Sequence, residues 1–144
     1  MGLLSMFRGS APAKKPSDDV LLMFAMLLMS CSDGHFDNSE AGSLVAFLGQ
    51  LPEFKGKNFE ELHAAACKLT NKFSTLPEAV QALSGLSSDT VKRKAFVLAA
   101  DLALSSGDVD EEEDVLLTQM QTVLGIDDFT ARKVLEVLAM KYAP

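Results

Sequence analysis

The chain has 144 residues, of which 48% are hydrophobic, so it is long and apolar enough to bury the core of one ordinary domain. Its 20 acidic residues outnumber the 13 Lys and Arg, which gives a formal net charge of −7 at pH 7. This balance argues against a nucleic-acid binder and against a protein held to anionic lipid by charge, because both need clustered basic side chains. Two cysteines are too few for a disulfide-dense secreted scaffold. With no recognisable signal peptide and no apolar run long enough to cross a membrane, we expect a cytoplasmic protein.

The first segment, residues 1–16, is a basic leader. It carries Arg8, Lys14 and Lys15 and no acid, and the two lysines stand between two prolines. This composition predicts a flexible tail, with a short amphipathic anchor built on the apolar residues before Arg8 as the alternative. Membrane contact is expected only through this leader, and residues 17–144 are expected to form one helical domain.

Helical periodicity accounts for the rest of the chain, and no segment alternates with the period of a strand. A first helix is expected over residues 17–33, and its stretch 20–29 is apolar on every face, which predicts the central helix of a bundle. Proline, glycine and Ser/Thr/Asp/Asn signals delimit the others. These are residues 38–51, 59–73, 78–83, 89–105, 110–124 and 128–142. The fold class is therefore predicted to be all-α, a compact bundle of about seven helices.

Two segments of the chain match when the sequence is aligned with itself. Each copy reads as an apolar helix, a glycine turn and an Asp-x-x-Glu that begins the next helix. The identical positions are Ser32/Ser105, Gly34/Gly107, Asp37/Asp110 and Glu40/Glu113. This internal repeat predicts two pseudo-symmetric helical-hairpin halves.

Helix capping explains many of the acids in the repeated turns. Asp37 and Asp110 are placed to accept backbone N–H bonds as N-caps, and Glu40 and Glu113 are placed to complete capping boxes. The glycine of each turn can take the left-handed conformation that ends a helix. On this interpretation the four acids need no ligand.

Asp33 and Asp101 are not explained by capping. Asp33 lies where the first helix ends, which is the unfavourable pole of the helix dipole, and Asp101 is the only charge in residues 95–104. A carboxylate in an apolar helical run needs a donor, a cation or a raised pKa. Oxygen-rich clusters suit Ca²⁺ or Mg²⁺, so a hard-cation site is expected near each turn. The alternative for Asp101 is a partly exposed residue paired with Lys or Arg.

Other motifs give weaker predictions. Residues 108–112 resemble the start of an EF-hand loop, but Glu113 stands where its glycine belongs and Gln119 replaces its closing Glu. Two Cys and two His would suffice for a zinc site, although Cys67 is more simply a buried small hydrophobe. These four residues are Cys31, His35, His63 and Cys67. Because no phosphate loop and no nucleophile–base pair stands at a recognisable spacing, no enzyme is expected.

Residues 28–40, residues 99–113 and residues 123–127 carry a resemblance to the TerB-like tellurite-resistance family, which extends over roughly residues 20–142. The resemblance implies an all-helical bundle with two related halves, in a bacterial cytoplasmic protein tied to tellurite or general chemical stress. It also implies a divalent-cation role for the turn acids, which by position are Asp33, Asp37 and Glu40, then Asp101, Asp110 and Glu113. Ser106 takes the place of Asp33 in the second copy, so that site is weaker or uses Asp101 and Asp108 instead. No catalytic residues are implied.

Three functions follow in order of preference. The first is a non-enzymatic, stress-associated helical protein that binds Ca²⁺ or Mg²⁺ through its acidic turns. The second is a protein–protein interaction module whose acids only cap helices, and whose apolar surface recruits an unidentified protein partner or a second copy as a homodimer. The third is a metal-assisted hydrolase or a tellurite-reducing enzyme, which needs an open metal position or a reactive thiol.

Overall fold

The computed structural model describes residues 15–30, 48–105 and 107–144, and these residues form helices and no strands. The prediction of an all-α fold is confirmed. The α-helices are α2 (Asp18–Ser30), α4 (Phe59–Thr70), α5 (Leu76–Gln81), α6 (Asp89–Leu104), α7 (Glu111–Leu124) and α8 (Asp128–Lys141), with short 3₁₀ turns η1 (Pro52–Phe54) and η2 (Ala82–Gly85). The helix expected over residues 38–51 falls mostly outside the described residues, as does the first copy of the repeated turn. The count of seven helices and the two symmetric halves therefore stay predictions.

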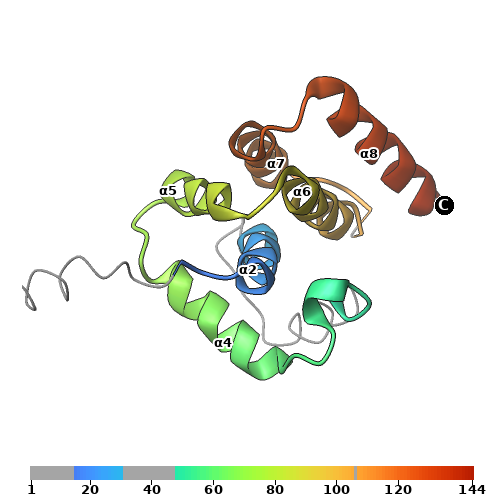
Figure 1. Ribbon diagram of the computed structural model, residues 1–144. Coiled ribbons are helices and arrows are strands. Elements are labelled where there is room, and N and C mark those ends of the chain that lie inside the picture. The colour runs from blue at the N-terminus through green and yellow to red at the C-terminus, as the bar shows by residue number, and fades with distance from the viewer. Residues whose placement is uncertain (1–14, 31–47, 106) are drawn as a thin grey trace, which may run out of the picture.

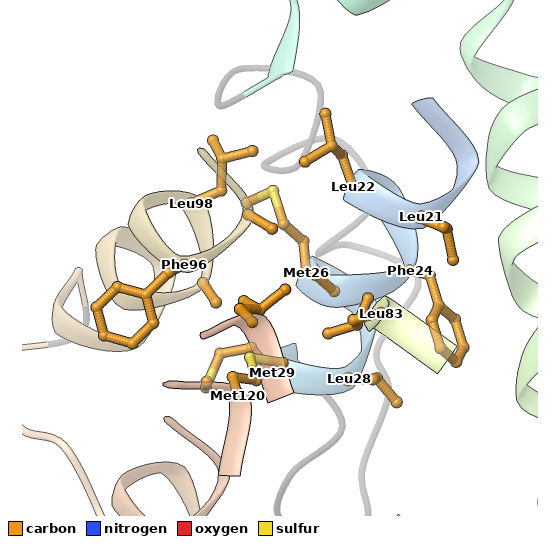
Figure 2. Packing of buried hydrophobic residues seen from close by; sticks show 14 of the residues in the cluster. Leu21, Leu22, Phe24, Met26, Leu28, Met29, Leu83, Phe96, Leu98 and Met120 are labelled. Carbon is orange, nitrogen blue, oxygen red and sulfur yellow. The ribbon is translucent and has the colours of Figure 1, made fainter. Parts of the chain in front are cut away.

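Helix α2 lies at the centre of the fold, between α4, α5 and α6 (Figure 1). Every side chain from Leu21 to Met29 is buried, on all sides of the helix. Figure 2 shows these side chains meeting residues of the surrounding helices, with Met29 beside Met120 of α7. On another side the Phe24 ring lies 6.0 Å, centroid to centroid, from that of Phe73. The prediction of a central helix is confirmed, because an element without a polar face has no side to present to water.

Two acids in the first turn of α2, Asp18 and Asp19, fix the start of this helix. Asp19 is only 7% exposed. It accepts a hydrogen bond from the Ser17 hydroxyl, and its Oδ2 lies 3.6 Å from Lys57 Nζ. Asp18 accepts hydrogen bonds from the backbone N–H, at 3.0 Å, and the hydroxyl of Ser87. These contacts tie the first turn of α2 to the segments that precede α4 and α6.

Most of the described helices begin with a side-chain cap. The N-cap side chain accepts a hydrogen bond from the backbone N–H three residues further on in α4, α5, α6, α7 and α8; the caps are Asn58, Thr75, Ser88, Asp110 and Asp127. Such a bond satisfies one of the backbone donors that a helix start leaves open. At the other end of α7, Gly125 takes a left-handed conformation with φ +67°. Local signals of this kind set the helix boundaries close to where the sequence predicts them.

Helix α8 lies at the edge of the bundle and packs mainly against α6 (Figure 1). It buries only Ala131 and Leu138. No helix within the described ranges is long and apolar enough to span a membrane.

Candidate functional site

The second copy of the repeated turn connects α6 to α7. Helix α6 is followed by its C-cap residue Ser105, whose N–H donates to the carbonyl of Asp101 at 3.0 Å. Gly107 then adopts φ +94°, and its N–H donates to the carbonyl of Leu104 at 3.0 Å. A side chain at this position would strain the backbone, which explains the glycine. The turn brings the chain directly to the acidic start of α7.

Asp110 and Glu113 form a capping box at the start of α7. Asp110 Oδ1 accepts the N–H of Glu113 at 2.8 Å, and Glu113 Oε1 accepts the N–H of Asp110 at 3.2 Å. The capping interpretation of these two acids is confirmed. Their carboxylates satisfy two backbone donors that the helix itself leaves without partners.

Asp101 pairs with Lys141, the last residue of α8, and with Tyr142, which follows it. Its side chain is 14% exposed, and both of its carboxylate oxygens lie near Lys141 Nζ, at 3.0 and 3.1 Å. The hydroxyl of Tyr142 also donates to Asp101. The interpretation of Asp101 as a partly exposed residue paired with a basic side chain is confirmed. We call Asp101, Lys141 and Tyr142 the α6–α8 latch.

The latch shifts the pKa values of Lys141 and Tyr142. The hydrogen bond to Asp101, followed by the one to Tyr142, raises the pKa of the Lys141 ammonium above its ordinary value. Burial, followed by the hydrogen bond to Asp101, raises the pKa of the Tyr142 phenol. Both groups therefore hold their protons more tightly in the folded chain, so the latch is at full strength at neutral pH.

The first turn of α7 carries more acids than the capping box uses. Glu111, Glu112 and Asp114 stand there beside Glu113, and none of these three takes part in an ion pair among the residues described. Negative charge at this end of a helix is favoured by the positive pole of its dipole. The start of α7 is therefore a concentrated negative surface.

Only some of the predicted metal ligands are among the residues that the structure describes. Asp33, Asp37, Glu40 and Ser106 lie outside the described residues. Among the residues that are described, no three side chains of His, Cys, Asp or Glu gather closely enough to hold a metal ion. Asp101 contacts α8, while Asp110 and Glu113 contact the backbone of α7. A cation site that draws on both turns stays a prediction.

One half of the proposed zinc set lies on α4. Cys67 Sγ is 3.8 Å from each ring nitrogen of His63. Burial raises the pKa of the Cys67 thiol, which keeps it protonated and weakens it as a nucleophile. Cys31 and His35 lie outside the described residues, so their part in a zinc site stays a prediction.

A comparison with models of known protein families assigns this chain to a family. The model of the family described as tellurite resistance protein TerB matches residues 19–135, which is most of the chain. The chain belongs to the TerB family. No curated protein and no solved structure matches it. The TerB match begins in α2, includes both acidic turns and ends inside α8.

The TerB chain also exposes an apolar surface that the sequence pattern did not single out. Phe129, Val137 and Met140 of α8 are 68%, 59% and 71% exposed. Beside them a hollow of about 430 Å³ lies along α8 and reaches α7 at Gln121. A sequence feature that could have indicated this surface is the distribution of apolar residues in 128–142 over more than one side of the helix. The structure buries only the side of Ala131 and Leu138.

Proposed function

We propose that this TerB-family protein is a non-enzymatic interaction module of a tellurite-resistance-type stress response in the cytoplasm. The observation that carries the proposal is a difference between the second acidic turn and the exposed side of α8. Each acid nominated in the second turn is used by the chain itself, whereas apolar side chains stay exposed on α8. Membership of the TerB family supports the link to tellurite resistance.

The acids of the second turn are costly to recruit for a ligand. A cation bound at Asp101 would have to displace two partners of this carboxylate, the Lys141 ammonium, whose Nζ lies 3.0 Å from Oδ2, and the Tyr142 hydroxyl. A cation at Asp110 or Glu113 would compete with the backbone N–H groups that these carboxylates cap. Leaving such donors without an acceptor destabilises the helix start. The second turn is thus better suited to holding helices in place than to holding an ion.

The exposed side chains of α8 are better suited to a partner. Large apolar residues scattered singly are normal on a surface, but several on one helix mark a candidate contact site. Phe129 and Met140 lie near opposite ends of α8 and are both mostly exposed. Burying a large aromatic or thioether side chain against a partner is a favourable use of such positions.

Tellurite tolerance of cells that depend on this protein tests the proposal. Phe129→Ser combined with Met140→Ser should abolish tolerance at an unchanged protein level. Val97→Ser with Val115→Ser, which makes two exposed apolar residues of α6 and α7 polar, is the matched control and should keep tolerance. Full tolerance with the α8 pair changed would contradict the proposal.

The enzyme alternative is separated in the same cells. Cys31→Ser with Cys67→Ser removes both thiols of the chain. An interaction module keeps its tolerance in this variant, whereas a thiol-dependent tellurite reductase loses it.

We also propose binding of Ca²⁺ or Mg²⁺ at the acidic turns as a second candidate function. The observation in its favour is the set of acids at the start of α7 that neither cap the helix nor form ion pairs within the described chain, namely Glu111, Glu112 and Asp114. Carboxylate oxygens are the ligands that these hard cations prefer. The acids of the first turn, Asp33, Asp37 and Glu40, would complete the set.

Calorimetric titration of the metal-stripped protein with Ca²⁺, Mg²⁺ and Mn²⁺ tests this candidate. Glu111→Gln combined with Asp114→Asn should weaken binding much more than Glu60→Gln combined with Glu61→Gln, the matched control in the first turn of α4. Neither pair includes a side chain that caps its helix, so the comparison reports on charge and ligation rather than on folding. No heat, together with no shift in melting temperature at millimolar metal, would exclude the cation role.

A further inference from the structure

We propose that the outer face of α8 binds a second copy of this chain, helix against helix and antiparallel. The outer face consists of Phe129, Lys133, Glu136, Val137 and Met140. This inference rests on the proposed interaction function and names its partner.

The outer face is a continuous stripe along α8. At 3.6 residues per turn, Phe129, Lys133, Glu136 and Met140 recur at steps of three or four and so share one side of the helix. Val137 flanks this stripe. The buried residues Ala131 and Leu138 lie on the opposite side, toward the bundle. Because α8 stands at the edge of the fold, its outer side has no neighbouring helix among the described elements (Figure 1).

The order of residues on this face is self-complementary. Phe129 and Met140 are equally far along the chain from the midpoint between Lys133 and Glu136. A two-fold axis through that midpoint places Phe129 of one copy against Met140 of the second copy, and does so twice. Contact between an aromatic ring and a thioether sulfur is favourable. A contact in which the same patch serves both subunits is the usual geometry of a homodimer.

The charges on the face agree with the same arrangement. The two-fold axis sets Lys133 of one copy beside Glu136 of the second copy, so opposite charges meet at the centre. A parallel arrangement would instead set Lys133 against Lys133 and Glu136 against Glu136. Lys133 Nζ now lies 4.4 Å from the centroid of the Phe129 ring, and Glu136 forms no ion pair within the described chain. Charge complementarity therefore selects the antiparallel pairing.

The size of the face sets the strength of the contact. One helix against another covers less area than a standard stable interface, so the dimer should be weak, with a dissociation constant on the order of 100 μM. The hollow beside α8, which Arg132, Leu135 and Ala139 help to line, lies next to this face and gives the second copy room to extend the contact toward α7. Association should thus respond steeply to single changes on α8.

Sedimentation equilibrium of the full chain, from about 10 μM to about 1 mM, tests the pairing through charge reversal. Lys133→Glu alone and Glu136→Lys alone each place like charges opposite one another in the dimer. Each should raise the dissociation constant about 10-fold, and the double variant should return it to within about 3-fold of wild type. Lys68→Glu, a reversal of an exposed charge on α4, is the matched control and should leave association unchanged. Helix content from circular dichroism confirms that each variant is folded.

Three outcomes would overturn the inference: a monomer at every concentration, a dimer that single reversals do not weaken, or a dimer that the double reversal does not restore. Only self-pairing predicts that restoration, because an unrelated partner would not carry the compensating charge. The proposed function fails separately. If Phe129→Ser with Met140→Ser leaves tolerance intact while the charge-reversal pattern holds, the dimer stands and the interaction role in tolerance does not.

Discussion

Helices α2 and α8 are nearly equal in length, at 13 and 14 residues, and they serve the molecule in opposite ways. Helix α2 is buried on every side from Leu21 to Met29, whereas α8 buries only Ala131 and Leu138. Burial of apolar area is the main source of stability, so α2 carries the fold. Helix α8 contributes little to the core and keeps an apolar side in solvent, which leaves that side free for a partner.

The two helices are also held by different forces. Packing alone positions most of α2. Helix α8 is held at its ends: Gln121 Nε2 donates to Asp128 Oδ1 at 2.8 Å at one end, and the α6–α8 latch closes the other. Polar contacts of this kind are directional but individually modest. The position of α8 should accordingly be more sensitive to a few polar side chains than to its own apolar residues.

The largest expected effect comes from truncating the same residue type in the two helices. Met26→Ala in α2 should lower the free energy of unfolding by about 3 kcal/mol, because it leaves a cavity around a fully buried site. Met140→Ala in α8 should change it by less than about 0.5 kcal/mol. Urea unfolding of the two variants measures the difference. Similar losses for both would contradict the contrast between the helices.

The latch should have the next largest effect. Asp101→Asn removes the charge that faces Lys141, and because the Lys141 side chain is about half exposed we expect a loss of only about 1.5 kcal/mol. Lys141→Met gives the partner variant for a double-mutant cycle. The two changes should not be additive, since either one already opens the ion pair. Additive losses would mean that the latch does not couple α6 to α8.

Loss of the capping box should lower the free energy of unfolding by less than loss of the latch, and two substitutions of the same residue provide the control. Asp110→Ala should lower the free energy of unfolding by about 1 kcal/mol, whereas Asp110→Asn should stay within a few tenths, because Asn is an equally good N-cap. The comparison is made by thermal or urea unfolding without added metal. If Asn costs as much as Ala, the carboxylate charge serves something other than the cap.

The pH dependence of stability should show the smallest effect. The pKa of Lys141 and the pKa of Tyr142 are both raised in the folded state. Stability from a raised pKa is complete below the unfolded-state value, near 10 for both groups, and is lost as the pH rises through the folded-state value. Wild type should therefore lose stability more steeply than Asp101→Asn above about pH 10. Urea unfolding at stepped pH measures the free energy of unfolding of both proteins. If it falls in parallel for the two proteins above about pH 10, the contact with Asp101 does not raise these pKa values.

Features with a local physical cause were predictable from the sequence. The stretch 20–29 has no polar face, so its central position followed from hydrophobicity alone. The spacing of Asp110 and Glu113 matches a capping box, and the structure forms it. The same reasoning left Asp101 open between a cation and a basic side chain, because its environment depends on elements far along the chain.

Contacts between distant segments were not predictable. Asp101 meets Lys141 and Tyr142 only because α8 folds back on α6, and nothing in the residues near Asp101 encodes that return. The apolar face of α8 was missed for a related reason. Where apolar residues stand on several sides of a helix, periodicity does not say which side faces the core. In α8 the side that carries the small residue Ala131 is buried, and the side that carries the large residue Phe129 is exposed.

Native-state hydrogen exchange of wild type and Asp101→Asn tests most directly whether α2 carries the fold while α8 is a separately latched helix. Amides of α2 should exchange only through global unfolding, and those of α8 through a local opening of lower free energy. Asp101→Asn should speed exchange in α8 about 10-fold beyond any change in α2. If α8 is as protected as α2, or if the substitution accelerates exchange equally in both helices, α8 is an integral part of the core and not a separately latched helix.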